Sequence, residues 1–195
     1  KIPFYQIDIL KKDKLQEVFN SYKFNSIIHL AAKKSVPESF KIPKIYNEVN
    51  VTGTKNLIDL ALQNKIKTFI YSTSASVYGE PNYLPCDEKH PLKPLSPYAS
   101  TKLEAEKLFE TDKISRSNMN VIILRSFNPI SSDPQSIIGE KSNDKTNNVM
   151  NEIHEVAIGR KDIFSIFGNN YPTNDGTCIR DYIHVEDLAR SHIHF

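Results

Sequence analysis

The sequence predicts an α/β fold with a doubly wound parallel sheet, and the order of its elements carries that prediction. Short β-type runs alternate with segments whose apolar residues recur at helical spacing. Parallel strands need crossover connections, which helices of this length provide. The composition agrees, because 39% of the 195 residues are hydrophobic, 25% are charged and the formal net charge is +2. These values exclude a disordered polyelectrolyte, a collagen-like repeat and a disulfide framework.

The elements follow one another along the chain. A β-type run over residues 3–7 ends at Asp8, and Asp13 with Gln16 predicts a capping box at the start of the first helix. The other predicted elements are strands over 26–30, 67–73, 121–127 and 164–167, a helix over 43–64, a helix that begins after Ser96, and helices over 149–158 and 185–195.

The helix over 43–64 contains Gly53 within its apolar stripe. A glycine there costs about 1 kcal/mol relative to alanine, so we expect it to let the helix lie close to the sheet. After Asn128 the composition changes to Ser, Asn, Asp and Gln, which predicts a loop that leaves the sheet. We therefore divide the chain into a Rossmann-like region, 1–128, and the start of a smaller region, 129–195, which returns to the first near 178–195.

Chemistry is expected at the carboxyl ends of the parallel strands, where loops leave a rigid platform. The residues predicted at those ends are Asp8, the run 31–34 (AAKK), the hydroxyl row 72–74 (STS), and Phe127 with Asn128. They combine a carboxylate, small residues that admit a ligand close to the backbone, hydroxyls and an amide.

The most informative group is Ser96-Pro97-Tyr98 with Lys102. Ser96 is a good N-cap and Pro97 a good first helical residue, which places Tyr98 in the first turn and Lys102 one turn later on the same face. A free phenol has a pKa of about 10, and a neighbouring ammonium and a helix N-terminus both favour the phenolate. We therefore expect Tyr98 to act as a general base on a hydroxyl that Ser74 holds, as alcohol oxidation requires. No side chain supplies a hydride acceptor.

Simpler interpretations stand beside these. With 9 Tyr in the chain, a Tyr-x-x-x-Lys pair is expected about once by chance. Asp8 is more often a turn carboxylate, Lys34 a solvated lysine and Asn50 a tolerated boundary residue. Arg180 followed by Asp181 is more often half of a surface ion pair worth under about 1 kcal/mol. Cys86, Cys178 and the 6 His lack metal spacing, so no metal site is predicted.

Together these motifs resemble the extended short-chain dehydrogenase/reductase superfamily and, within it, the family of UDP-glucose 4-epimerases. The resemblance covers essentially the whole chain, and its longest run is the most specific. The matching runs are 27–32 (IIHLAA), 50–54 (NVTGT), 69–79 (FIYSTSASVYG), 96–102 (SPYASTK), 125–129 (RSFNP) and 166–187 (IFGNNYPTNDGTCIRDYIHVED).

The resemblance implies a bound NAD and a reversible oxidation at C4 of a UDP-linked hexose. It assigns catalysis to Ser74, Tyr98 and Lys102. The residues it places at the cofactor are Asp8, Ile9, Leu30, Ala31, Ala32, Lys33, Lys34, Asn50, Ser74, Tyr98, Lys102 and Phe127. The residues it places at the UDP-sugar are Ser74, Asn128, Asn148, Val149, Ser165, Ile166, Phe167 and Arg180. A guanidinium fork at Arg180 suits a pyrophosphate.

Two features depart from the family pattern. The glycine-rich turn that cradles the NAD pyrophosphate is absent from a chain with 6 Gly, so we expect an internal fragment that lacks the first strand-helix unit and does not bind NAD tightly alone. Ser126 stands where these epimerases usually carry an aromatic residue.

Several alternatives stay open at this point. A dehydratase would need an acid pair after the strand that ends at Ser74, which is disfavoured here. Another UDP-sugar epimerase, a decarboxylase, or a catalytically silent sugar-nucleotide-binding protein remains possible. The lack of an apolar run of about 20 residues and of a secretory signal predicts a cytoplasmic protein without a membrane partner. The charge balance predicts no nucleic-acid partner, and the family resemblance implies a homodimer.

Overall fold

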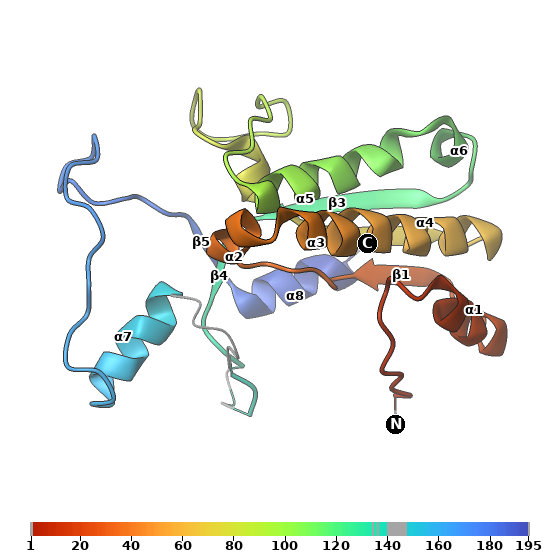
Figure 1. The fold of residues 1–195 in the computed structure, drawn as a ribbon, viewed down its shortest axis with the longest axis horizontal. Helices are drawn as coiled ribbons and strands as arrows, with labels where there is room; N and C mark the ends of the chain where they lie inside the picture. The colour runs from red at the N-terminus through yellow and green to blue at the C-terminus, as the bar shows by residue number, and fades with distance from the viewer. Residues whose placement is uncertain (1, 134, 136, 140–147, 195) are drawn as a thin grey trace. The chain divides into compact units, whose positions relative to one another are not determined.

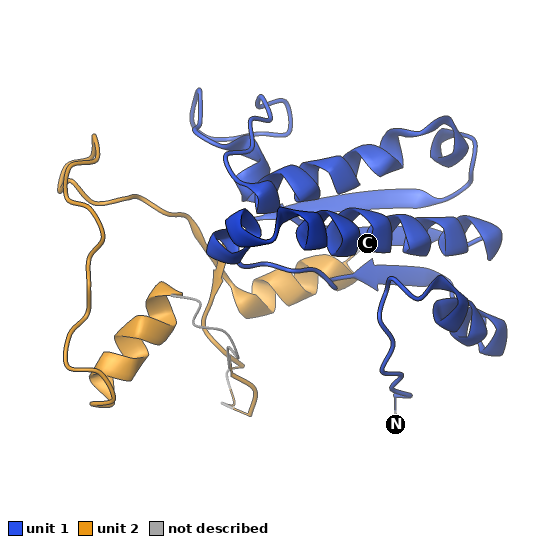
Figure 2. Cartoon of the chain, in the orientation of Figure 1, with its two compact units in different colours: residues 1–126 blue, residues 127–195 orange. Residues whose placement is uncertain are grey.

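The computed structural model describes residues 2–133, 135, 137–139 and 148–194. The chain forms two compact units, residues 1–126 and residues 127–195 (Figure 2). Among the described residues, no helix is both long enough and apolar enough to cross a membrane.

Unit 1 contains a parallel sheet in the order β1-β2-β3 (Figure 1). Its strands are β1 (Ser26–His29), β2 (Thr68–Ser74) and β3 (Asn120–Ser126). The pairing brings Ile70 level with Ile122, and Ser74 level with Ser126 at the carboxyl edge. Strand β2 is central and its Phe69, Ile70 and Tyr71 are almost fully buried. The predicted Rossmann-like α/β class is therefore confirmed.

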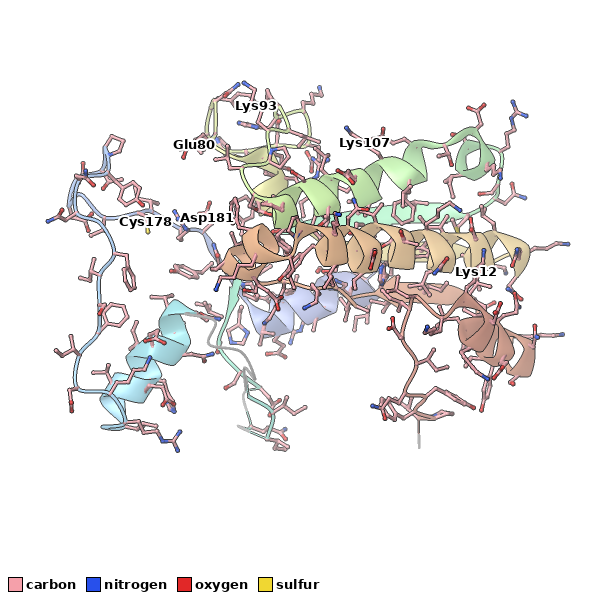
Figure 3. The ribbon with its side chains drawn as sticks, viewed as in Figure 1. Lys12, Glu80, Lys93, Lys107, Cys178 and Asp181 are labelled. Atoms are coloured by element: carbon pink, nitrogen blue, oxygen red, sulfur yellow. The ribbon has the colours of Figure 1, made fainter. Side chains whose placement is uncertain are left out.

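Helices connect these strands and cover the sheet. They are α1 (Lys12–Ser21), α2 (Val36–Lys41), α3 (Pro43–Asn47), η1 (Glu48–Thr52), α4 (Gly53–Gln63), η2 (Ala75–Tyr78), α5 (Pro97–Lys107), η3 (Leu108–Glu110) and α6 (Asp112–Ser115). Helix α5 packs on β2, and the core joins α4, β2 and α5 through Leu57, Phe69 and Ala105. Lys12, labelled in Figure 3, forms an ion pair with Asp59, 2.8 Å between Nζ and Oδ2, which joins α1 to α4.

The predicted helix over 43–64 is present but is not a regular α-helix. Its middle, η1, is a π-helical turn that buries Asn50. Such turns are frequent at functional sites. A Cβ on Gly53 would lie 2.5 Å from Cδ1 of Ile9, so the glycine lets the segment before α1 pack closely against this helix. The sequence predicted a close approach to the sheet instead, and that prediction is wrong.

Three local predictions are wrong. Helix α1 has no side-chain cap, since it begins after Lys11, and Gln16 donates to Asn20 instead of closing a capping box with Asp13. Residues 3–7 and 164–167 form no strand, because neither segment finds a ladder partner among the described residues. A β-type run becomes a strand only beside a neighbour that accepts its hydrogen bonds.

Unit 2 contains a two-stranded parallel sheet and two helices. They are β4 (Asn128–Ile130), β5 (Tyr182–His184), α7 (Val149–Ala157) and α8 (Val185–Ile193). The pairing brings Asn128 level with Tyr182, where the sequence predicted only a loop. Both predicted helices are confirmed within two residues at their ends.

Candidate active site

Strand β2 ends at Ser74, which lies half-buried at the carboxyl edge of the sheet. Its Oγ accepts a hydrogen bond from the backbone N–H of Ser76 at 3.2 Å and so caps η2. The chain therefore turns sharply after the strand, with the hydroxyl fixed at the turn.

Helix α5 begins as the sequence predicts. The Oγ of Ser96 accepts from the backbone N–H of Ala99 at 3.1 Å, and Pro97 is the first helical residue. This start places Tyr98 in the first turn, where interaction with the Ser74 hydroxyl lowers the pKa of its phenol. The cap and the strand end thus bring together two of the three predicted catalytic side chains.

The electrostatics of Tyr98 differ from the expectation. Burial raises the pKa of the phenol above its ordinary 10, and the hydrogen bond with Ser74 is the opposing influence that lowers the pKa. The expected effect of Lys102 on this pKa is absent, because the ammonium is directed elsewhere. The pKa of Tyr98 therefore lies above 10, and its phenol is neutral at pH 7.

Lys102 is buried and bound to the neighbouring strand. Its Nζ donates to the carbonyl oxygen of Ser72 at 2.7 Å and lies 4.6 Å from the ring centroid of Tyr71. Burial lowers the pKa of Lys102 from 10.5 to about 8, and the charge of Glu106 partly opposes this decrease. An ammonium has three N–H donors, so at least one remains for a ligand hydroxyl.

Asn50 joins the strand-end segment to α5. Its Oδ1 accepts from the backbone N–H of Lys33 at 2.8 Å, and its Nδ2 donates to the Lys33 carbonyl and to Oγ1 of Thr101, both at 3.0 Å. Thr101 in turn donates to the carbonyl of Tyr98 at 2.8 Å. The interpretation of Asn50 as a boundary residue is wrong, since it is 1% exposed and fully hydrogen-bonded.

The segment 30–34 follows β1 and offers its surface to solvent. Leu30 is 64% exposed, and Ala31 and Lys34 are also exposed, whereas Ala32 is half-buried. The Nζ of Lys33 pairs with Glu38 at 3.0 Å, so this side chain is held against α2. The segment therefore presents mainly backbone, Leu30 and small side chains.

Asp8 and Ile9 lie before α1. The Oδ1 of Asp8 accepts from the backbone N–H of Leu10 at 2.9 Å, the arrangement of a turn carboxylate. The carbonyl of Ile9 accepts from Nδ2 of Asn56 at 3.1 Å, which fixes this turn to α4. Asp8 itself remains exposed.

The expected sugar-nucleotide residues lie in unit 2, and most are exposed. Asn128 donates from Nδ2 to the carbonyl of Asp181 at 2.9 Å, and Asn148 caps α7, of which Val149 is the first residue. Arg180 donates to the carbonyl of Ile179 at 2.7 Å and does not pair with Asp181. The remaining members are Ser74 of unit 1, described above, and Ser165, Ile166 and Phe167 in an irregular segment. Phe127, expected at the cofactor, is 38% exposed at the start of unit 2.

Sequence reasoning placed Ser72 in the hydroxyl row at the strand end, but it missed the contact of Ser72 with Lys102 and missed Tyr71 and Glu106. Tyr71 and Ser72 contact its ammonium directly, and Glu106 lies one helical turn farther along α5. Glu106 forms a buried ion pair with Arg125, 2.8 Å between Oε2 and Nη2. The four-residue spacing from Lys102 to Glu106 is the one signal that could have drawn attention to this carboxylate.

Comparisons with known proteins agree with this geometry. The model of the NAD dependent epimerase/dehydratase family matches residues 1–195. The chain is 42% identical over 193 residues to the UDP-glucose 4-epimerase of Dictyostelium discoideum, covering 99% of this chain and 56% of that protein. The human UDP-glucose 4-epimerase is 41% identical over 193 residues, with 98% and 56% covered.

Two solved structures are similar in fold. One is UDP-glucose 4-epimerase from Bifidobacterium longum in complex with NAD+ and UDP, with a TM-score of 0.90, 32% identity, and 97% of this chain and 57% of that chain covered. The other, from Stenotrophomonas maltophila with bound NAD and formylated UDP-arabinopyranose, has a TM-score of 0.92, 34% identity, and 97% and 56% covered. The chain spans about half the length of the relatives it matches. It belongs to the NAD dependent epimerase/dehydratase family.

Proposed function

We propose that the full-length protein interconverts UDP-glucose and UDP-galactose by reversible, NAD-dependent oxidation at C4. The observation that carries this proposal is that Ser74 and Tyr98 meet at the carboxyl edge of one parallel sheet, while the buried Lys102 ammonium is held at the Ser72 carbonyl of the same strand. The similarity to UDP-glucose 4-epimerases over 99% of the chain supports the choice of substrate.

The residues of unit 1 fit part of an NAD molecule. Lys102 uses one N–H on Ser72, so another can meet a ribose hydroxyl. Exposed Leu30 and Ala31 offer an apolar, open strand end against which a flat ring can lie. Asn50 holds the backbone of this segment in place. When bound, NAD supplies the hydride acceptor that no side chain provides.

Tyr98 performs the proton transfer. In the proposed reaction Tyr98 reacts as the phenolate, after losing its own proton to solvent. The phenolate oxygen accepts the proton of the C4 hydroxyl as the carbinol is oxidised, and the resulting phenol returns that proton after the sugar has presented its other face. Ser74 has a single O–H. It donates to the Tyr98 oxygen while that oxygen is negatively charged, and to the oxygen on C4 once the proton has moved to Tyr98. The positive charge of Lys102 would then stabilise Tyr98 only while its oxygen is negatively charged.

Unit 2 supplies the candidate residues for the UDP moiety. The guanidinium of Arg180 is exposed, and one of its five N–H groups donates to the carbonyl of Ile179. The other four N–H groups can bind a pyrophosphate. Asn128, Asn148, Val149 and the 165–167 segment are proposed to complete this site. A homodimer and a cytoplasmic location stay predictions.

The test offers the full-length protein UDP-galactose that carries deuterium at C4, with UDP-glucuronate as the competing substrate. We expect UDP-glucose that retains the deuterium, because the hydride returns to the carbon from which it came and does not exchange with water. Turnover of UDP-glucuronate without conversion of UDP-galactose would contradict the proposal and favour a uronate epimerase. Loss of the label to water would contradict the oxidative mechanism.

A further inference from the structure

The charge of Lys102 depends on a buried group one helical turn away. Lys102 is 4% exposed, and the described part of the chain places no carboxylate within ion-pair distance of its ammonium. A carbonyl oxygen and an aromatic face compensate for part of the lost hydration, but neither carries a full charge. A further source of negative potential is therefore needed.

Glu106 is that source, and its geometry is fixed. It lies on α5 four residues after Lys102, is 2% exposed, and accepts three hydrogen bonds from the guanidinium of Arg125 on β3. The N–O distances are 3.3 and 3.1 Å from Nε and 2.8 Å from Nη2. Arg125 also lies 5.2 Å from the ring centroid of Tyr78, which holds the guanidinium on the side of Glu106.

The other charged or titratable groups around Lys102 do not replace this carboxylate. His29 on β1 is buried, and burial together with Lys102 lowers the pKa of its imidazole to about 4, so it is neutral. Tyr71 on β2 and Tyr98 on α5 have raised pKa values and are neutral as well. The charged side chains on the neighbouring α2, α3, η1 and η3 are Glu38, Lys41, Lys44, Glu48 and Glu110. Among the described groups, Glu106 is the one whose charge raises the pKa of Lys102.

We infer that Glu106 is a positioning residue of the active site: its carboxylate, fixed by Arg125, keeps the Lys102 ammonium charged in its buried place over the Tyr71 ring. Glu106 acts through Lys102 and touches no reacting atom. This inference rests on the proposed function for its catalytic consequence, although the effect on Lys102 itself does not require turnover.

The test measures the charge of Lys102 directly in the full-length protein. The 13Cε signal of Lys102, assigned by its loss in Lys102→Arg, is followed from about pH 6 to about pH 11. We expect Glu106→Gln, which keeps the shape but removes the charge, to lower the titration midpoint by about one pH unit. Glu106→Asp, which keeps the charge, should retain most of the wild-type midpoint. Glu104→Gln is the matched control, because Glu104 lies exposed on the same helix and pairs with Asn47.

A second variant covers the case in which Glu106→Gln does not fold. Glu106→Met/Arg125→Met removes both charges together and replaces the ion pair by apolar packing, which buried pairs often tolerate. The midpoint of Lys102 should fall by less than in Glu106→Gln, because loss of the Arg125 charge opposes loss of the Glu106 charge. A midpoint equal to that of Glu104→Gln in a folded variant would overturn the inference and leave the pair a purely structural one.

The turnover profile separates this inference from the proposed function. In Glu106→Gln the alkaline limb of the rate of UDP-galactose conversion should move to lower pH by the same amount as the midpoint. A shifted midpoint in a protein that converts no UDP-galactose would refute the proposed function alone. A shift of the alkaline limb of the pH–rate profile with an unchanged titration midpoint of Lys102 would refute the role of Glu106.

Discussion

The two units hold their candidate functional residues in different ways. In unit 1, Asn50 and Lys102 are almost fully buried and bind across different elements, to the 30–34 segment and to β2 respectively. In unit 2, Arg180 is exposed and contacts the carbonyl of its own neighbour. Under the proposed function, the candidate residues of unit 1 act from its core, whereas Arg180 of unit 2 leaves its donors available for a ligand. Substitutions in unit 1 should therefore cost stability, and substitutions in unit 2 should cost binding.

The largest effect on stability is expected at Asn50. Asn50→Ala leaves the N–H and C=O groups of Lys33 and the hydroxyl of Thr101 without this partner, which should lower the free energy of unfolding by about 3 kcal/mol. Urea unfolding of the full-length protein measures this change. Asn47→Ala is the control, because Asn47 is exposed on the same helical segment and its loss should cost under about 1 kcal/mol. Equal effects of the two substitutions would show that the buried hydrogen bonds of Asn50 do not stabilise unit 1.

A smaller effect depends on pH. The pKa of His29 falls from 6.5 to about 4 on folding, so the unfolded chain binds more protons between these values. The contribution of neutral His29 to the free energy of unfolding is fully present above pH 6.5 and is lost as the pH falls toward 4. Between pH 7 and about pH 5 the free energy of unfolding should fall by about 2 kcal/mol. His29→Gln should remove this slope, whereas His154→Gln, in exposed surroundings, should keep it. A wild-type stability that does not fall toward pH 5 would contradict a buried neutral imidazole.

The smallest effect is expected at Arg180. Arg180→Ala should weaken UDP binding by about 1–2 kcal/mol through loss of the guanidinium fork, with little change in stability. Titration calorimetry with UDP measures the binding, and Arg160→Ala, which removes another exposed arginine of unit 2, is the control. Unchanged UDP affinity in Arg180→Ala would show that unit 2 does not use this side chain.

Local signals predicted the parts of the molecule that depend on neighbours in sequence. Ser96 and Pro97 predicted the start of α5 and the place of Tyr98 because a helix cap is decided within four residues. Apolar runs predicted β1, β2 and β3 because each has a neighbouring strand. The run over 3–7 failed for the opposite reason, since its backbone has no ladder partner in the described part of the chain.

The remainder depends on contacts that are distant in sequence. The burial of Asn50 in a π-helical turn requires Lys33 and Thr101, which lie 17 and 51 residues away. The pKa of Tyr98 follows from burial and Ser74 rather than from the Lys102 spacing that the sequence emphasised. A spacing rule places two side chains on one face of a helix, but only the packed structure decides whether they point toward each other.

The central claim is that the phenol of Tyr98 moves the proton of the proposed reaction, and Tyr98→Phe tests it most directly. In the full-length protein this substitution should lower the rate of UDP-galactose conversion by about 10³-fold while bound NAD is retained. Tyr22→Phe, which removes a phenol that hydrogen-bonds Tyr5 at the surface, should leave the rate unchanged. A rate for Tyr98→Phe within about threefold of the wild type, in folded protein with NAD bound, would contradict the account.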